Sequence, residues 1–504
     1  MSAGLLTAME TRHARVLYES VATEIATLID AGTLLPGERV PSVRRLSRQK
    51  RVSISTVLQA YRLLENRGRI EARPQSGYYV RARARPVAEP VISSPPKVPS
   101  PVGVHDLVSR VLGATHDPRV VRLGAALPGH ELMPAARLRR MLAATARRCP
   151  EALTTYAVPP GREELRRQIV RHTLNWGCSL TADDVIITNG CMEALNLCLR
   201  AVAGPGDIVA LESPTYFGLL QIIESLGMKA LEIPTHPRNG ISLDALALAC
   251  EREKVKVCLV MSNISNPLGS MMPDAAKKRL VQLLARRGIP LIEDLVYGDL
   301  YFSQTPPHAA KAHDRNGMVM LCSSFSKTLA PGFRVGWVAP GRWRAQVERL
   351  KFVSSVGNPE LLQLTIAEFL ENGGYERQLR SLRRAFAARI EHTKRAVAEY
   401  FPEGTRATNP AGGFVLWVEL PAGADSLALY ESAMREGISI APGPMFSASD
   451  RYRNCIRLNC GCTWTPLVER ALARVGELAK AQLAHAARRP RARRRAPPSR
   501  LITA

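Results

Sequence analysis

The sequence predicts an α/β protein that joins an N-terminal winged helix-turn-helix domain to a larger domain with a mostly parallel sheet covered by helices on both faces. Helical patterns and then a hairpin pattern follow one another within residues 12–82. From residue 119 to residue 483, short β-branched runs alternate with helical stretches, as they do in parallel sheets. Six prolines between residues 86 and 101 mark a largely unstructured linker, which we place over 83–118.

Composition excludes several classes of protein. A chain of 504 residues with 46% hydrophobic residues can bury a sizeable core and is not broadly disordered. No apolar run reaches the ~18 residues that a membrane span needs, and the N-terminus lacks the pattern of a secretory signal. The ten cysteines form no C-x-x-C pair, which favours reduced, buried thiols over disulfides or a metal site. We therefore expect a cytoplasmic protein with no membrane partner and no bound metal.

Positive charge is concentrated at the two ends of the chain. The formal net charge is +25; residues 1–85 contain 15 Lys and Arg against 7 Asp and Glu, and residues 484–504 contain 7 Arg and no acid. An excess of this size indicates an anionic partner. We interpret 484–504 as a basic disordered tail, with a non-specific nucleic-acid contact as the alternative.

The N-terminal part has the signals of two short helices after a longer one. Apolar residues recur at helical spacing between residues 17 and 29, and Gly32 follows as a stop. Ser42 is a candidate N-cap for a short helix over 43–49, and Ser53 for the next helix. That next helix has apolar residues on one face and Ser55 and Gln59 on the other.

A hairpin completes the predicted domain. Strand-like residues 70–72 and 78–80 flank a turn that carries Arg73 and Gln75. A helix with small polar side chains can contact base edges while its N-terminus faces phosphate, and the hairpin can reach the neighbouring groove. The pattern favours binding to double-stranded DNA, with a small helical domain with a solvated basic face as the alternative.

The residues of this domain resemble the GntR-type winged helix. The resemblance rests on the stretches 36–47, 52–57, 60–61 and 76–80. It implies DNA contacts from Arg44, Ser53, Ser55 and Thr56, with Gly77 in the wing, and we add Gln59 and Arg73 from the pattern itself. Many members of the family have Arg where this chain has Ile54, so we expect one base or phosphate contact to be missing here.

In the larger part, chemically useful residues follow successive predicted strands. Ligands of such sheets bind outside the carboxyl ends of the strands. The residues in this position are Gly190, Cys191, Met192, Tyr216, Asn266, Asp294, Tyr297, Ser324 and Lys327, with Arg334 seven residues further on. Each is common alone as a cap, a turn, a core aromatic or a surface lysine. Their order on successive strands is what indicates a site.

The chemistry of these groups coincides in one cofactor. A helix N-terminus with Ser and Arg suits a phosphate, an Asp suits a protonated ring nitrogen, and a Lys can form a Schiff base with an aldehyde. Pyridoxal 5'-phosphate carries all three groups. Cys191 could instead be a nucleophile, but Lys327 already supplies covalent chemistry, so we favour a structural thiol.

Residues 119–483 resemble the fold-type I pyridoxal-phosphate enzymes of the class I/II aminotransferase group, which implies a smaller α/β subdomain over about 355–483. The matching stretches are 155–156, 160–166, 188–190, 213–216, 265–269, 293–297, 324–336 and 456–458. The resemblance implies that Lys327 forms the Schiff base and then transfers protons, and that Asp294 pairs with the ring nitrogen. It also implies ring contacts from Tyr216, Asn266 and Tyr297, and phosphate contacts from Ser324, Arg334 and the backbone of Gly190, Cys191 and Met192.

Two further residues predict a partner subunit and a bound amino compound. By the same resemblance, Tyr156 reaches the phosphate of a partner subunit, which implies a homodimer, and Arg457 binds the carboxylate of an amino-acid effector or substrate. In place of Cys191-Met192 many members of the group have Ser or Ala followed by Gln, so we expect the backbone donors to remain and one side-chain contact to phosphate to be lost.

The two parts together resemble the MocR family of bacterial transcription regulators. That resemblance implies a regulator whose aminotransferase-like domain senses pyridoxal phosphate, or an amino compound reacting with it, and controls operator binding. An active aminotransferase with an accessory DNA-binding domain is the alternative, because the expected catalytic residues are present. A plain DNA-compacting protein would explain the charge but not the residues at the strand ends.

Overall fold

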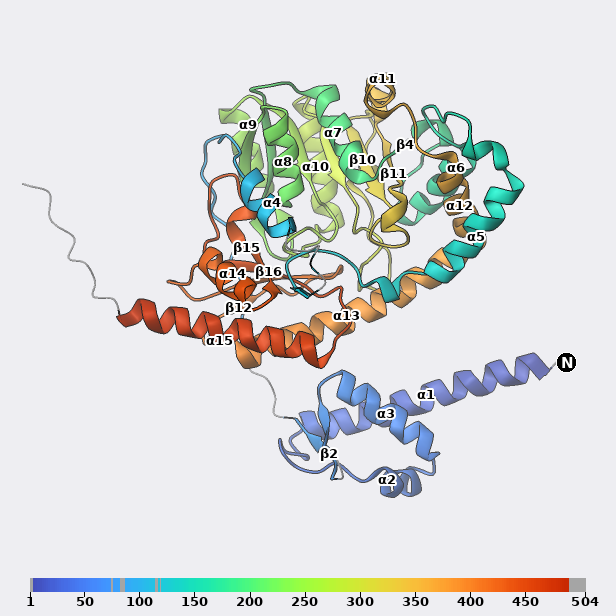
Figure 1. The fold of residues 1–504 in the computed structure, drawn as a ribbon, viewed down its shortest axis with the longest axis vertical. Coiled ribbons are helices and arrows are strands. Elements are labelled where there is room, and N and C mark those ends of the chain that lie inside the picture. The colour runs from blue at the N-terminus through green and yellow to red at the C-terminus, as the bar shows by residue number, and fades with distance from the viewer. Residues whose placement is uncertain (1–2, 74–75, 82–86, 114–116, 118, 489–504) are drawn as a thin grey trace, which may run out of the picture.

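The computed structural model of the protein describes residues 3–73, 76–81, 87–113, 117 and 119–488 (Figure 1). Gln75 and most of the expected basic tail, from residue 489 onward, lie outside the described residues. No helix among the described residues is long and apolar enough to cross a membrane.

The N-terminal domain has the expected order of elements. Ser42 caps α2 by accepting a hydrogen bond from the Arg45 amide, and Ser53 caps α3 by accepting one from the Thr56 amide. Tyr61 is fully buried on the inner face of α3, where its hydroxyl donates to the Pro41 carbonyl at 2.5 Å. The elements are α1 (Ala3–Asp30), α2 (Val43–Lys50), α3 (Ile54–Asn66), β1 (Ile70–Arg73) and β2 (Gly77–Val80).

An eight-stranded sheet forms the centre of the larger part, in the order β4-β11-β10-β9-β8-β5-β6-β7. Neighbouring strands from β10 to β6 are parallel, whereas β11 and β7 run antiparallel to their neighbours. The predicted mostly parallel sheet is therefore confirmed. The strands are β4 (Ile186–Thr188), β5 (Ile208–Ser213), β6 (Lys229–His236), β7 (Gly240–Ile241), β8 (Val255–Val260), β9 (Leu291–Asp294), β10 (Val319–Ser324) and β11 (Gly336–Ala339).

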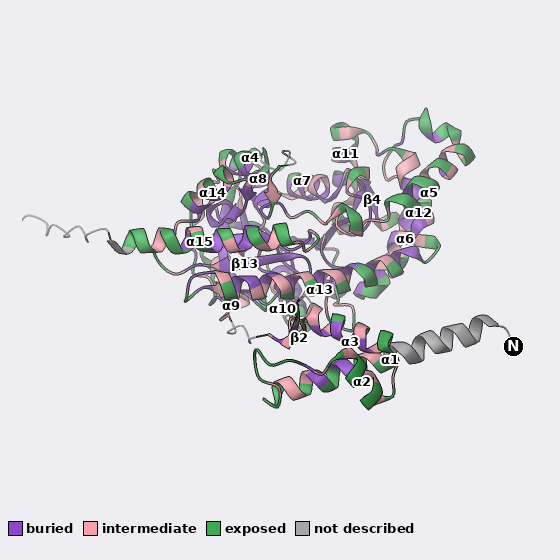
Figure 2. Cartoon of the chain, turned by 60° about the horizontal axis from the view of Figure 1, so that its bottom comes forward, coloured by how far each residue is buried: buried purple, intermediate pink, exposed green. Residues whose placement is uncertain are grey.

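Helices cover both faces of this sheet, which leaves its strands buried (Figure 2). The apolar residues of α7 (Cys191–Val202), α8 (Phe217–Ser225) and α11 (Arg344–Ser355) pack on one face. The opposite face packs against α9 (Leu243–Arg252) and α10 (Asp274–Arg286) at one end and against α5 (Ala135–Arg148), α6 (Glu163–Thr173) and α12 (Glu360–Glu371) at the other.

A smaller α/β unit follows, as expected. Its four-stranded sheet has the order β12 (Arg406–Ala407), β13 (Val415–Glu419), β16 (Cys455–Asn459) and β15 (Ala441–Pro442). Its helices are α13 (Gly374–Tyr400), α14 (Ser426–Arg435) and α15 (Pro466–Arg488), and its strand β14 (Ile438–Ser439) pairs with β3 (Val121–Arg122). Helices α13 and α15 lie between the sheets and the winged helix domain (Figure 1).

The expectation of a largely unstructured linker over 83–118 is corrected at its C-terminal end. Residues 105–113 form helix α4 (His105–Gly113), whose Val108 and Val111 are buried in the same core as α7 and α8. Upstream of α4, Ser93 donates its hydroxyl proton to the Ser213 carbonyl and accepts from the Thr235 amide. Prolines prevent regular structure here, but the remaining polar groups still bind the edge of the large domain.

Candidate cofactor site and DNA-reading face

A cavity of about 350 Å³ lies at the carboxyl ends of the parallel strands. Strands β9 and β10 end at Asp294 and Ser324, and the loops after β4, β5 and β8 supply most of the other predicted residues. The predicted residues that line the cavity are Cys191, Met192, Tyr216, Asn266, Asp294, Tyr297, Ser324, Lys327 and Arg334.

Lys327 has an amine that loses its proton more readily than an exposed lysine does. Its Nζ donates to the carbonyl of Ala126 at 2.8 Å and lies 5.8 Å from the centre of the Tyr297 ring. Burial in the cavity, together with the positive charges of Arg457 and Arg334, lowers the pKa of Lys327 to about 8. Because only the unprotonated amine is a nucleophile, this environment suits a lysine that attacks an aldehyde.

Asp294 is a buried carboxyl group in the same cavity. Its Oδ1 accepts from the Val296 amide at 2.9 Å and from the thiol of Cys191 at 3.4 Å. Burial raises the pKa of Asp294 to about 6. A carboxylate in such a position is stabilised by a bound cationic group, such as a protonated ring nitrogen.

The N-terminus of α7 and Arg334 meet at one corner of the cavity. Arg334 donates to the carbonyl of Asn189 at 3.1 Å and to the hydroxyl of Ser326 at 3.4 Å. Gly190 precedes α7 with a φ of 78°, and a methyl group at this position would approach the Arg334 guanidinium to 2.5 Å. A larger residue at position 190 would strain the backbone and displace the guanidinium from its place at the start of α7.

Arg457, on β16, is a fully buried cation beside the cavity. It donates to Asn266 Oδ1 at 3.0 Å and to the Gly124 carbonyl at 2.6 Å, and its guanidinium lies 5.0 Å from the ring of Phe446. Its Nε has no hydrogen-bond partner, and no carboxylate pairs with it among the described residues. Burial lowers the pKa of Arg457 to about 10.

Some predicted residues lie elsewhere, and some lining residues were not predicted. Tyr156 is 89% exposed and does not line the cavity, so its expected contact with a partner subunit remains a prediction. Leu112, Phe217 and Ser326 line the cavity without having been expected there. Phe217 and Ser326 adjoin predicted residues in sequence, which was a usable signal, whereas nothing in the sequence pointed to Leu112 on α4.

The surroundings of Cys191 favour a structural thiol, and this assignment stays a prediction. It is buried, and burial together with the neighbouring Asp294 raises its pKa well above the usual value. A thiol that resists ionisation is a poor nucleophile.

The predicted DNA contacts lie on an open face of the winged helix domain. Arg44, Ser53, Ser55, Gln59 and Arg73 are exposed, and Thr56 is half-buried. The hydroxyl of Ser53 lies 2.7 Å from that of Ser55 and 2.8 Å from that of Thr56, so the first turn of α3 presents a cluster of hydroxyls. Ile54 is 50% exposed beside this cluster, and Gly77 has a φ of 105° in the wing.

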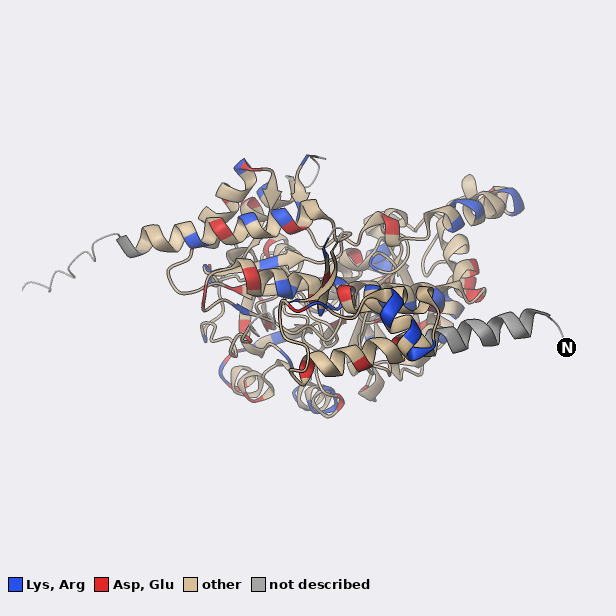
Figure 3. Cartoon of the chain, turned by 90° about the horizontal axis from the view of Figure 1, so that it is seen from below, with Lys and Arg blue, Asp and Glu red and all other residues tan. Residues whose placement is uncertain are grey.

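The helix that precedes this cluster in the chain is rich in basic residues. Helix α2 contains Arg44, Arg45, Arg48 and Lys50, and blue segments lie on the winged helix domain when it is seen from below (Figure 3). The wing residue Arg73 pairs with Glu71 at 2.9 Å. Fold and site together define a class of protein: a winged helix DNA-binding domain joined to an aminotransferase-like domain.

Comparisons with known families agree with this class. Residues 124–475 match the family "Aminotransferase class I and II", and residues 17–80 match the "Bacterial regulatory proteins, gntR family". A regulator of Escherichia coli, described as the uncharacterized HTH-type transcriptional regulator YjiR, is 40% identical over 460 residues, which cover 91% of this chain and 98% of that protein. The chain belongs to the class I and II aminotransferase family, as a MocR-type member with an N-terminal GntR domain.

Enzymes with the same fold but without the winged helix are also similar. The 2-aminoadipate transaminase of Thermus thermophilus is 29% identical over 382 residues, covering 75% of this chain and 94% of the enzyme. The structure of the multiple substrate aminotransferase from Thermococcus profundus superposes with a TM-score of 0.70 at 26% identity, covering 75% of this chain and 95% of that one. The structure of the α-aminoadipate aminotransferase LysN, with a phosphopyridoxyl-leucine bound, has a TM-score of 0.69 at 27% identity, covering 76% of this chain and 100% of that one.

The family and the fold imply pyridoxal phosphate as the cofactor, and the residues of this chain fit it. The corner formed by α7 and Arg334 suits the phosphate, and the buried carboxyl group of Asp294 needs a cationic partner. Lys327 offers an amine of lowered pKa in the same cavity.

Proposed function

We propose that the protein is a cytoplasmic, homodimeric transcription regulator that binds a double-stranded operator and adjusts this binding when an amino compound enters its pyridoxal-phosphate site. The observation that carries the proposal is that one chain combines an open DNA-reading face with a cofactor cavity beside a buried arginine that has no acidic partner among the described residues. A buried cation in this position is best explained by an anionic ligand.

Within the cavity, each side chain has a distinct task. Pyridoxal phosphate, when bound, supplies an aldehyde that reacts with amines and a ring that withdraws electrons. Lys327 provides the amine that holds the cofactor, and its Nζ accepts or gives up a proton when another amine competes for that place. Asp294 keeps the ring nitrogen protonated by its negative charge. Ser324, Arg334 and the first amides of α7 hold the phosphate.

Arg457 selects the incoming compound. Its guanidinium can take a carboxylate through Nε and the adjacent Nη atoms, because Asn266 and the Gly124 carbonyl fix its orientation. Tyr216 and Tyr297, whose pKa values are both raised by burial, remain neutral and pack against the ring. The preferred effector is therefore an amine that also carries a carboxylate.

An active aminotransferase is the second candidate. It is favoured by Lys327 and Asp294 sharing one cavity, which is the minimum that proton transfer on the cofactor needs. The two candidates differ in outcome. An aminotransferase converts an amino acid to a 2-oxo acid at each turnover, whereas a regulator binds the amino acid and changes its affinity for DNA.

The test uses the full chain loaded with pyridoxal phosphate. Operator sequences are first selected from a pool of genomic fragments, and gel shifts are then run with a panel of amino acids and with the corresponding amines that lack the carboxylate. We expect at least one amino acid to change the operator affinity of the wild-type protein. Lys327→Ala should show no such response. Arg44→Ala should bind DNA more weakly at every effector concentration. A salt series accompanies each shift, since phosphate contacts set much of the affinity.

Two results would overturn the proposal. The first is a compound that reacts with the cofactor, as its absorbance shows, while operator affinity stays unchanged for every compound in the panel. The other is steady production of 2-oxo acid with no selected operator, which would favour the aminotransferase.

A further inference from the structure

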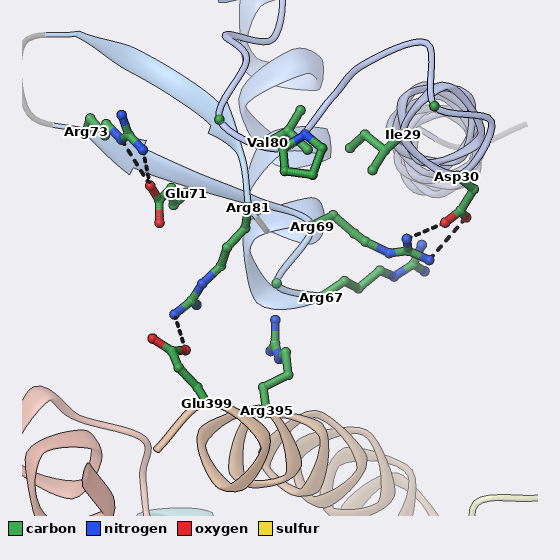
Figure 4. Close-up of a pocket in the computed structure, with 14 residues that line it drawn as sticks. Ile29, Asp30, Arg67, Arg69, Glu71, Arg73, Val80, Arg81, Arg395 and Glu399 are labelled. Carbon is green, nitrogen blue, oxygen red and sulfur yellow. Dashed lines mark hydrogen bonds and ion pairs between the residues drawn. The ribbon is translucent and has the colours of Figure 1, made fainter. Parts of the chain in front are cut away.

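A cavity of about 900 Å³ lies between the winged helix domain and the end of α13 (Figure 4). Three partly exposed ion pairs line it, which are Arg69 with Asp30, Arg73 with Glu71, and Arg81 with Glu399. Exposed pairs of this kind contribute little to stability, and their charges are already matched within the chain. Size alone therefore does not mark this cavity as a binding site.

A smaller cavity, of about 180 Å³, opens onto a network of polar side chains that are largely buried. His172, on α6, and Asp299, in the loop after β9, both line it. Their side chains are 12% and 10% exposed, and His172 Nε2 lies 2.8 Å from Asp299 Oδ1. Burial opposes charge on both groups, but the attraction between them raises the pKa of His172 and lowers the pKa of Asp299. The surroundings therefore favour a charged Asp299 as the acceptor of the network.

Asp299 accepts hydrogen bonds on both carboxylate oxygens and on its carbonyl. Trp176 Nε1 donates to Oδ1 at 3.2 Å, and the hydroxyl of Tyr375, on α13, donates to Oδ2 at 3.0 Å. The carbonyl of Asp299 accepts from Arg383 Nε, also on α13, at 2.7 Å. Hydrogen bonds that involve a charged group are stronger than neutral ones, so Asp299 holds α13 at two points.

Tyr375 joins Asp299 to the loop that carries Lys327. Its hydroxyl lies 2.8 Å from the hydroxyl of Thr328, the residue after Lys327. Because the single hydroxyl proton of Tyr375 goes to Asp299, the Thr328 hydroxyl is the donor in this contact. Burial and the nearby Asp299 raise the pKa of Tyr375 well above its usual value, so the phenol keeps its proton. The ring of Tyr375 also packs on Phe325, two residues before Lys327, with ring centres 5.9 Å apart.

The network thus connects two segments that contribute to the cofactor cavity. Asp294 ends β9 and Asp299 lies in the loop that follows, whereas Lys327 and Thr328 follow β10. By the proposed function, Asp294 meets the ring nitrogen of pyridoxal phosphate and Lys327 meets its aldehyde, which is attached to the opposite side of the same ring. A fixed spacing between the two segments therefore sets in advance the distance between the two groups that the cofactor contacts.

We propose that Asp299 and Tyr375 are positioning residues for Lys327: Asp299 orients the Tyr375 hydroxyl, which accepts from Thr328 and so holds the Lys327 amine where it can attack the aldehyde. In this step the amine nitrogen forms a bond to the aldehyde carbon, and the aldehyde oxygen leaves as water with the two amine protons. Neither positioning residue lines the cofactor cavity, so both act through Thr328. The inference rests on the role of Lys327 in the proposed function.

Removal of single hydroxyl groups in the full chain tests the proposal. Tyr375→Phe keeps the ring that packs on Phe325 and removes only the hydroxyl, and Thr328→Val removes the donor but keeps the branched shape. The matched control is Thr365→Val. Thr365, on α12, is as buried as Thr328, but its hydroxyl donates to the Leu361 carbonyl of its own helix.

Two ligands separate positioning of the lysine from general damage to the cavity. Pyridoxal 5'-phosphate can react with Lys327, whereas 4'-deoxypyridoxine 5'-phosphate has the same ring and phosphate with a methyl group in place of the aldehyde. Calorimetry measures the affinity for each ligand, and stopped-flow absorbance measures the rate at which the aldehyde is captured. Poor packing of the cavity weakens both ligands alike, whereas a misplaced amine weakens only the aldehyde.

We expect Tyr375→Phe and Thr328→Val each to slow capture and to weaken pyridoxal phosphate about two- to tenfold, the scale of one buried hydrogen bond, with unchanged affinity for the deoxy compound. The double variant should lie close to the more affected single variant, because both changes remove the same bond. Thr328→Ser, which keeps the hydroxyl, should behave as wild type, and Thr365→Val should change neither ligand. Equal weakening of the two ligands, or wild-type capture in both single variants, would overturn the proposal.

Two further variants assign any failure. Asp299→Asn should slow capture in the same way as Tyr375→Phe, and normal capture in it would refute the role given to Asp299. Borohydride reduction followed by peptide mapping identifies the lysine that has reacted. Capture that persists in Lys327→Ala would refute the proposed function at its lysine, whereas capture that is lost there but normal in Tyr375→Phe would refute only the positioning.

Discussion

Replacement of Arg457 by Met tests whether the buried guanidinium is kept for a ligand. Burial lowers the pKa of Arg457 from 12.5 to about 10, which corresponds to a cost of about 3 kcal/mol for holding the charge in this buried position. Arg457→Met removes this cost and so stabilises the fold. The variant also leaves Asn266 Oδ1 and the Gly124 carbonyl without their donor, which destabilises the fold by about 1–3 kcal/mol. The two contributions oppose each other, so we expect the free energy of unfolding to stay within about 2 kcal/mol of the wild-type value.

Urea unfolding of the cofactor-free protein measures this change. All five tryptophans lie at residue 176 or beyond, so their fluorescence reports the large domain alone. A loss of 3–5 kcal/mol, the usual consequence of breaking a buried ion pair, would refute the reasoning, because it would mean that the fold already neutralises the charge.

The same variant has a second readout in ligand binding. The wild-type protein loaded with pyridoxal phosphate should bind an amino acid at least tenfold more tightly than the matching amine that lacks the carboxylate. The reason is that hydrogen bonds between charged groups contribute about 1.5–3 kcal/mol. Arg457→Met should lose this preference while still binding the amine. An unchanged preference would place carboxylate recognition elsewhere.

Three further predictions concern single groups. Covalent capture of pyridoxal phosphate by Lys327 should accelerate as pH rises through about 8 and then level off, and stopped-flow absorbance that kept rising past pH 10 would contradict the lowered pKa. Because burial raises the folded pKa of Asp294 to about 6, protonation stabilises the fold at low pH and this contribution is lost as pH rises through 6. Asp294→Asn should therefore stabilise the cofactor-free protein by about 3 kcal/mol at pH 8 but little at pH 4, and it should weaken cofactor binding. Equal effects on urea unfolding at both pH values would argue against this prediction. Ser53→Ala should remove about 1 kcal/mol of capping from α3, seen as faster amide exchange in residues 54–58 and weaker operator binding, whereas unaltered exchange would mean that the cap contributes nothing.

Local signals allowed much of the fold to be predicted from the sequence. Ser42 and Ser53 mark helix starts because a side-chain oxygen there satisfies a free amide of the first turn, and the structure shows both bonds. The residues of the cavity could be predicted as a group because parallel strands place their carboxyl ends at one edge of the sheet. Asp294 and Lys327 thus meet although 33 positions separate them.

Other features depend on contacts between distant segments, for which the sequence holds no local signal. The carbonyl of Ala126 accepts from Lys327 across 201 positions, and Tyr375 reaches Thr328 from another helix. Helix α4 was missed because the prolines before it dominate the composition of the segment. Its apolar residues Val108 and Val111 find their partners only once α7 and α8 are folded.

The position of α4 bears on how such a protein can be divided. Leu112, on this helix, lines the cofactor cavity, so the segment that joins the two domains is also part of the wall around the ligand. A fragment that begins at residue 119 would lack this wall and would expose the apolar surface that Val108 and Val111 cover. An independent sensor fragment should therefore begin near residue 87. A DNA-binding head transplanted from another regulator should be joined before that point, because the connecting segment belongs to the sensor.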